Sequence, residues 1–201
     1  MEILRFTPEN KLIEQVRNVT MLTDKTVYPY KDAIIHIEDM NIDDFMPTQL
    51  YILRNHIEFQ TQLREELLQK YHDTLRLFGS LMLKNAGVTT GMMPPIVEDD
   101  YEMGPSLLDG THRVWLAKKL GMKSLSVLHI SGVSPETPMI PLPNQWHEVV
   151  EYDELPTDKN LKKRYRDLPG QKYDYYRDFS NITGIGKDPR SEMTVNAPAT
   201  Y

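Results

Sequence analysis

The sequence predicts an α/β domain of the α+β kind, in which short strands alternate with helices. Three observations predict this class: compact β-prone runs, helical stretches with apolar residues on one side, and a strand–turn–helix–strand order in the second half. The chain has 201 residues, an ordinary length for one domain and enough to bury a core. We therefore expect one domain with an appended C-terminal extension.

The composition excludes several function classes. The chain has no cysteine, which excludes disulfides, thiolate metal sites, Fe–S clusters and cysteine nucleophiles. Its formal net charge is −6, which argues against a protein that coats nucleic acid non-specifically. No apolar run reaches the ~18 residues that span a bilayer, and the N-terminus lacks a signal-peptide pattern. We expect a cytoplasmic protein without a membrane partner.

The first half is expected to hold two helices around one strand. Thr7 is placed to cap a helix that opens at Pro8 and has apolar residues on one face. Residues 33–38 form a compact β-prone run that predicts a strand. From residue 48 to about residue 84 almost every residue favours a helix or is neutral, and apolar residues advance by three or four. We therefore expect a long helix there, continuous or kinked, with Thr48 as its cap.

The second half predicts a compact βαβ-like unit. Residues 96–97 and 106–108 are two short β-prone runs joined by an acidic loop. The second run leads into the turn 109–113, with the sequence Asp-Gly-Thr-His-Arg, and then into an amphipathic helix that ends at Gly121. A third β-prone run follows over residues 124–130.

The composition changes after Ser131. Four prolines arrive within nine residues, and residues 151–180 are rich in charge and tyrosine. We therefore divide the chain into residues 1–131 and residues 132–201, and expect the latter to pack on the same domain as a Pro-rich crossing and a charged extension. The spacing of the aromatic residues within 173–179 suits a helix that packs its tyrosines on the core.

The turn 109–113 carries the most chemistry. The first turn of a helix leaves backbone N–H groups unpaired at the positive end of its dipole. Gly110 allows close approach of a ligand, Thr111 offers a hydroxyl, and His112 and Arg113 add further donors. The turn therefore predicts a polyphosphate cradle, although neither GxxxxGK[ST] nor GxGxxG occurs. The alternative is that Asp109 only shapes the turn and Arg113 forms a surface ion pair.

Several segments together resemble the ParB/sulfiredoxin superfamily. They are Pro-Ile-Val at 95–97, Leu-Leu-Asp-Gly-Thr-His-Arg at 107–113 and Ala-Lys-Lys-Leu-Gly at 117–121. Upstream, Ile-His-Ile at 35–37 and Pro-Thr-Gln at 47–49 resemble the first strand and proline–polar turn of that superfamily. The resemblance covers roughly residues 33–131. It implies a small mixed sheet with flanking helices that binds a nucleotide at the turn.

Within that superfamily the turn is most similar to the free-serine-kinase type, which has the pattern DG-x-HR. Sulfiredoxin chemistry is excluded because Thr111 stands where those proteins have their cysteine. The partition proteins bind CTP and carry a helix-turn-helix domain, and no such domain is evident after residue 131. The kinases also have a glutamate near the proline turn. Here Thr48 and Gln49 stand instead, and the nearby acids Glu38, Asp43 and Asp44 do not match its position.

The resemblance implies a nucleotide-dependent phosphotransferase or NTP hydrolase that uses Mg²⁺ with ATP, ADP or CTP and an unidentified phosphate acceptor. Asp109 is then the expected general base or Mg²⁺ ligand. His112 and Arg113 would neutralise charge on the phosphates. The residues expected to bind the nucleotide are Gly110, Thr111, His112, Arg113, Thr48 and Gln49.

The alternative function is a DNA-associated ParB-like binding module or a nuclease-type accessory module. Residues 159–166 hold five positive charges, and tyrosines that could stack on bases follow them. Lys162, Lys163 and Arg164 would then contact nucleic acid. However, residues 151–180 contain seven acids and seven bases, so this segment as a whole is neutral.

One pair of possible metal ligands lies outside the turn. His36 and Glu38 share a face of the expected strand because they are two residues apart. Two ligands do not make a site, and the sequence shows no third. We therefore expect a surface or partly buried pair, and a structural role for the isolated His129.

Overall fold

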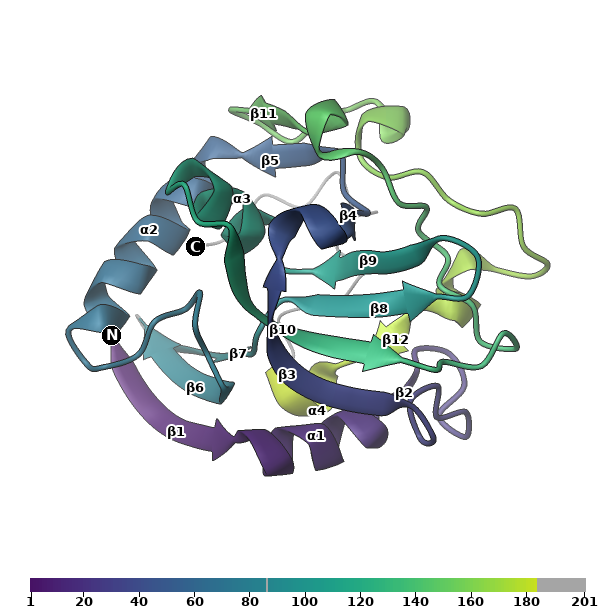
Figure 1. Ribbon diagram of the computed structural model, residues 1–201, viewed down its shortest axis with the longest axis horizontal. Helices are drawn as coiled ribbons and strands as arrows, with labels where there is room; N and C mark the ends of the chain where they lie inside the picture. Colours follow the sequence, from purple (N-terminus) through teal and green to yellow (C-terminus); the bar gives the residue numbers. More distant parts are fainter. Residues whose placement is uncertain (86, 184–201) are drawn as a thin grey trace.

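The computed structural model describes residues 1–85 and 87–183, and a five-stranded mixed sheet lies at its centre (Figure 1). In this sheet β10 (Ser124–Ser131) runs antiparallel to β3 (Ile34–Asn41) and parallel to β8 (Ile96–Asp100), and β8 runs antiparallel to β9 (Gly104–Asp109). The α+β fold class is confirmed. In spatial order the strands are β3, β10, β8, β9 and β4 (Met46–Pro47).

The unit around the 109–113 turn differs from the expected βαβ arrangement in one respect. Helix α3 (Thr111–Lys119) connects β9 to β10, but β8 lies between these two strands. Because β9 is antiparallel to β8 and β10 is parallel to it, β9 and β10 are antiparallel, whereas a βαβ unit joins parallel strands. The carboxyl end of β9 and the amino end of β10 therefore lie at the same end of the sheet, and α3 connects them across one face of it.

The predicted end of this helix is confirmed. Gly121 has a φ of +71°, its N–H donates to the carbonyl of Lys118 at 3.0 Å, and the N–H of Met122 donates to the carbonyl of Ala117 at 3.0 Å. These bonds satisfy carbonyls of the last helical turn and turn the chain into β10.

The N-terminal residues form a strand that the sequence did not predict. β1 (Glu2–Pro8) pairs with β6 (Gly79–Asn85), and β6 pairs with β7 (Val88–Met92) to give a three-stranded sheet. Helix α1 (Glu9–Arg17) follows directly. The predicted cap at Thr7 is wrong, because Thr7 lies in β1 opposite Ser80 and no side chain caps α1.

The predicted helix from residue 48 to about residue 84, continuous or kinked, is correct only over α2 (Arg54–Leu68) and wrong at both ends. The segment divides into β5 (Tyr51–Leu53), α2 (Arg54–Leu68) and β6. Thr48 caps nothing, because it is buried and its hydroxyl donates to the carbonyl of Leu107 at 2.7 Å. Helix-compatible residues form β6 because β1 supplies a partner strand, and its apolar side chains pack against α2. Tertiary pairing thus overrides local propensity.

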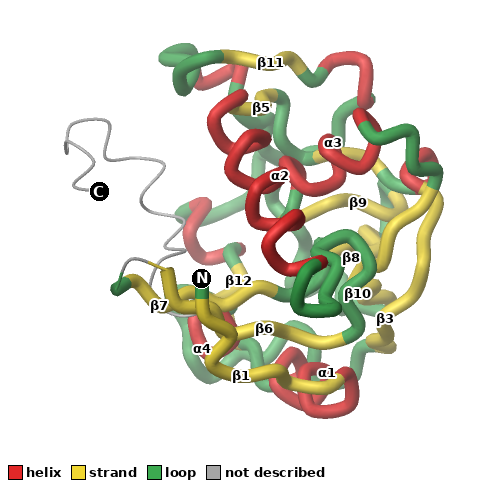
Figure 2. Tube along the Cα trace, turned by 90° about the vertical axis from the view of Figure 1, so that its left-hand side faces the viewer, coloured by secondary structure: helices red, strands yellow, loops and turns green. Residues whose placement is uncertain are grey.

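Helices cover both faces of the central sheet (Figure 2). On one face α1 packs its buried residues Leu12 and Val16 on strands β3 and β10. On the other face α3 packs Val114 and Ala117 on β8, β9 and β10. Helix α2 lies beside α3, which places both helices near the carboxyl end of β9.

The residues after Ser131 cross back over the domain without a long helix in the described part of the chain. Within 173–179 the expected tyrosine helix is wrong: a short 3-10 turn, Lys172–Tyr175, is followed by strand β12. Residues 184–201 of the expected extension lie outside the described residues. The other elements are β11 (Val150–Tyr152) beside β5, β12 (Arg177–Asp178) beside β2 (Thr20–Met21), α4 (Ser180–Thr183), and 3-10 turns at Ile42–Asp44, Trp146–Glu148 and Lys159–Leu161.

Among the helices described here, none combines the length and the apolar character needed to cross a membrane.

Candidate functional site

The turn between β9 and α3 has a backbone that only glycine accommodates. Gly110 precedes the first residue of α3 and has a φ of +93°. A Cβ atom at this position would lie 2.8 Å from Cβ and 2.9 Å from Cα of Pro95. The cap residue of this nine-residue helix is a glycine, so it offers no side-chain acceptor to the first-turn N–H groups, which lie at the positive end of the helix dipole.

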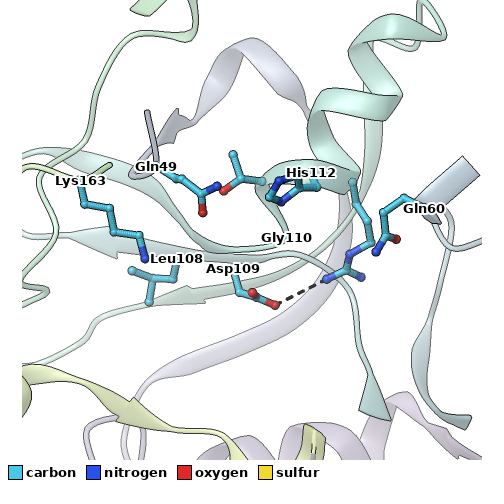
Figure 3. Close-up of a pocket in the computed structure, with 9 residues that line it drawn as sticks. Gln49, Gln60, Leu108, Asp109, Gly110, His112 and Lys163 are labelled. Atoms are coloured by element: carbon cyan, nitrogen blue, oxygen red, sulfur yellow. Dashed lines mark ion pairs between the residues drawn. The ribbon is translucent and has the colours of Figure 1, made fainter. Parts of the chain in front are cut away.

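A cavity of about 240 Å³ opens over this turn (Figure 3). All five residues of the 109–113 turn line it, and Gln49 lines it as the sequence analysis expected. Thr48 does not line it. Lys163, expected to contact nucleic acid, extends towards Leu108 and Asp109 in the cavity (Figure 3). The lining residues are Gln49, Gln60, Leu108, Asp109, Gly110, Thr111, His112, Arg113 and Lys163.

His112 is held as a neutral acceptor. The N–H of Leu53 donates to its Nε2 at 3.1 Å, and the ring lies 4.8 Å from that of His56, centroid to centroid. Burial, followed by the neighbouring His56, lowers the pKa of His112 to about 4, against the opposing effect of Asp109. The imidazole is therefore uncharged near pH 7. The positive side chains that line the cavity are Arg113 and Lys163.

Arg113 connects the turn to the segment between β7 and β8. Its side chain is almost fully buried, its Nη1 donates to the carbonyl of Met93, and its Nη2 lies 3.7 Å from Oδ2 of Asp109. Burial lowers the pKa of Arg113, while the charge of Asp109 acts in the opposite direction. Arg113 thus orients Asp109 as well as contributing charge.

Asp109 is the sole carboxylate among the described residues that line the cavity. Its side chain is 39% exposed, so a ligand can reach it. Mg²⁺ in nucleotide sites commonly takes one or two protein carboxylates, with phosphate oxygens and water completing its shell. One accessible carboxylate beside a phosphate-sized cavity fits that donor set. The other acids considered from the sequence, Glu38, Asp43 and Asp44, do not line the cavity.

Gln60 is a lining residue that the sequence analysis missed. It belongs to α2 and lies on the side of the cavity opposite Lys163 (Figure 3). Its Oε1 is buried and has no hydrogen-bond partner among the described residues. An unpaired buried acceptor costs ~1–3 kcal/mol, and a donor group of a ligand would relieve this cost. No signal in the sequence distinguishes this glutamine from a solvent-facing helix residue.

The three basic residues expected to contact nucleic acid have different surroundings. Lys163 lines the cavity. Arg164 is exposed, and its Nη2 lies 2.8 Å from Oε1 of Glu148. The backbone carbonyl of Lys162 accepts the N–H of Leu50 at 2.9 Å, which fixes this segment beside β5. These three residues are neighbours in the sequence, but each one contacts a different part of the protein.

The family model for the ParB CE domain matches residues 11–150, well over half of the chain. The chain belongs to the ParB CE domain family. The predicted membership of the ParB/sulfiredoxin-like superfamily is confirmed by this match. The matched range includes β3, the 109–113 turn, α3 and β10.

Two solved structures resemble this ParB CE domain in part. Protein Atu1540 from Agrobacterium tumefaciens is 17% identical with a TM-score of 0.29, over 49% of this chain and 40% of that chain. A Pnob8-like ParB-N domain is 18% identical with a TM-score of 0.26, over 53% of this chain and 33% of that chain. The chain thus spans less than half the length of either protein. No curated protein matches it.

Proposed function

We propose that this ParB CE domain binds the phosphates of a nucleotide in the cavity over the 109–113 turn and catalyses Mg²⁺-dependent phosphoryl transfer or NTP hydrolysis there. One observation carries the proposal: the first turn of α3, Asp109 and Lys163 all border the same cavity. This arrangement supplies backbone donors, a positive side chain and one carboxylate to a bound phosphate.

The size of the cavity supports binding through the phosphates. Pockets that enclose whole drug-sized ligands are typically ~300–1,000 Å³. The cavity here is smaller, at about 240 Å³, and most of its lining residues are polar or charged. We therefore expect the phosphate chain to lie inside and the base to extend towards the entrance.

Lys163 and Arg164 provide a matched pair of variants for testing nucleotide binding. Thermal unfolding is measured with ATP, ADP, CTP and GTP, each with and without Mg²⁺, for the unmodified chain, Lys163→Ala and Arg164→Ala. A nucleotide at 100 times its dissociation constant stabilises the fold by ~2.7 kcal/mol. We expect Lys163→Ala to weaken binding about tenfold, equivalent to ~1.4 kcal/mol, because it removes one charged hydrogen bond. Arg164→Ala keeps the affinity, because Arg164 pairs with Glu148.

Two results would contradict nucleotide binding in this cavity. One is the absence of stabilisation by any of the four nucleotides. The other is an equal loss of affinity in both variants. If both variants instead weaken DNA binding alike, with a steep dependence on salt, the DNA-associated alternative is favoured.

Asp109→Asn tests the catalytic part of the proposal. The amide keeps the size of the side chain but can neither accept a proton nor hold Mg²⁺ as a carboxylate does. We expect nucleotide binding without Mg²⁺ to persist while turnover falls ~10²–10⁴-fold. Release of inorganic phosphate, followed with Arg164→Ala as the control, measures this effect. Normal turnover by Asp109→Asn would refute the role assigned to Asp109.

A further inference from the structure

A second group of polar side chains converges on the central sheet, and none of its members lines the cavity. His36 on β3 lies directly opposite His129 on β10 in the antiparallel register. Glu38 lies two residues further along β3, and alternate residues of a strand face the same side. The register therefore brings together three side chains that are distant in sequence, with Glu38 and His129 separated by 91 residues.

The distances within this cluster are those of a compact ligand set. Glu38 Oε1 lies 3.0 Å from Nε2 of His36 and 2.6 Å from Nδ1 of His129. One nitrogen from each histidine and one oxygen of Glu38 all lie within 4.8 Å of one another. The two imidazole rings meet edge to face, with centroids 5.3 Å apart and an interplanar angle of 81°.

A fourth residue orients the cluster from the neighbouring strand. Asp99 on β8 places its Oδ1 2.8 Å from Nε2 of His129, the nitrogen that faces away from Glu38. Histidines that bind metal ions almost always donate their other N–H to a carboxylate, a carbonyl or water. The Asp99–His129 contact has this geometry.

The cluster is accessible from solvent. The side chains of His36 and Glu38 are 43% and 40% exposed, and that of His129 is 15% exposed. An ion can therefore enter from the side of β3, while His129 stays fixed in the sheet.

We propose that His36, Glu38 and His129 bind one divalent transition-metal ion of the Zn²⁺ class, and that Asp99 acts as a positioning residue for His129. Two imidazoles and one carboxylate suit this class, whereas Mg²⁺ and Ca²⁺ take oxygen ligands. Three protein ligands leave a coordination position for water or a small ligand on the exposed side.

A metal-free cluster is the competing account. Both nitrogens of His129 face carboxylate oxygens, so a charged imidazolium could join Glu38 to Asp99 by hydrogen bonds alone. That account predicts no saturable binding of metal at stoichiometric concentration.

Competition with a chromogenic chelator distinguishes the two accounts. The full chain is stripped of metal and titrated with Zn²⁺, and the expected result is one ion bound per chain. Asp99→Asn is expected to weaken binding ~10–100-fold, and His36→Ala and Glu38→Gln to weaken it at least as much. The control is His147→Ala, which removes an exposed histidine outside the cluster and should bind Zn²⁺ normally.

Cobalt provides a second measurement. Co²⁺ bound to the unmodified chain should give the intense visible absorption of a four- or five-coordinate site, and His36→Ala should lose it. Far-UV circular dichroism of each metal-free variant shows that it remains folded. The absence of one-to-one Zn²⁺ binding by the unmodified chain would overturn the proposal, as would equal affinity in folded His36→Ala. Lys163→Ala should bind Zn²⁺ normally, so this test is independent of the proposed nucleotide site.

Discussion

Two neighbouring carboxylates on β8 have opposite environments. Glu98 faces the α1 side, where Nη2 of Arg177 lies 2.6 Å from its Oε1 and the hydroxyl of Tyr30 donates to its Oε2 at 2.6 Å. Both charged side chains there are under 5% exposed. Asp99 faces the opposite side, is 33% exposed, and contacts His129.

The two environments distinguish polar groups that stabilise the fold from polar groups that a ligand can reach. Arg177 also donates to the carbonyls of Pro138, Tyr175 and Thr137, at 3.1, 2.8 and 2.8 Å. This network lies inside the protein, and its members bond to one another. The cluster around Asp99 and the cavity around Asp109 instead border solvent. We call the buried group of Tyr30, Glu98 and Arg177 the closed network, and the two groups that border solvent the open sites. We expect substitutions in the closed network to change the stability of the fold, and substitutions in the open sites to change ligand binding.

The largest expected effect belongs to the closed network. Arg177→Met leaves the charge of Glu98 buried without a cation, which we expect to lower the free energy of unfolding by ~3–5 kcal/mol. Urea denaturation measures this loss. The double variant Glu98→Gln with Arg177→Met should recover part of it, because no unpaired charge remains. If the single variant lost less than about 1 kcal/mol of unfolding free energy, this would contradict the distinction between the closed network and the open sites.

The next effect concerns His112 in the cavity and depends on pH. Its pKa is lowered from 6.5 to about 4, so between these values the unfolded chain takes up a proton that the folded chain does not. Folding stability should therefore fall as the pH decreases from 6.5 to 4, by ~3 kcal/mol from this residue at 1.36 kcal/mol per pKa unit. Urea denaturation across this range should show a shallower dependence for His112→Gln. An NMR titration of His112 centred near pH 6.5 would contradict the prediction.

The smallest effect on stability is expected in the open cluster. Without metal, Glu38→Gln removes contacts of a half-exposed side chain, and such surface pairs contribute only ~0–1 kcal/mol. Denaturation in the presence of a chelator measures this value. A loss of unfolding free energy as large as that of Arg177→Met would show that this cluster stabilises the fold and belongs with the closed network.

Local patterns predicted much of the sheet and the turn. The runs at residues 33–38, 96–97, 106–108 and 124–130 correspond to β3, β8, β9 and β10. The turn 109–113 leads into α3 as expected, and Gly121 ends that helix. These features depend on apolar runs, glycine geometry and helix capping, which short stretches of sequence specify.

The features that the sequence missed depend on distant partners. Residues 79–85 are compatible with a helix, but they form a strand because they pair with β1, which is distant in the sequence, as well as with β7. His129 becomes a neighbour of His36 through the register of β3 and β10. Gln60 reaches the cavity because α2 packs beside α3. Local propensity contains none of this information.

The position of Arg177 in the chain has a consequence for synthesis. Strand β12 pairs with β2, and Lys25 Nζ lies 2.5 Å from Asp178 Oδ2, so the late segment closes over residues near the start. Until Arg177 leaves the ribosome, Glu98 has no cation to meet it. While the residues before Arg177 emerge, the nascent chain therefore lacks this contact, and we expect its core to gain its full stability only once the segment around Arg177 is outside the exit tunnel.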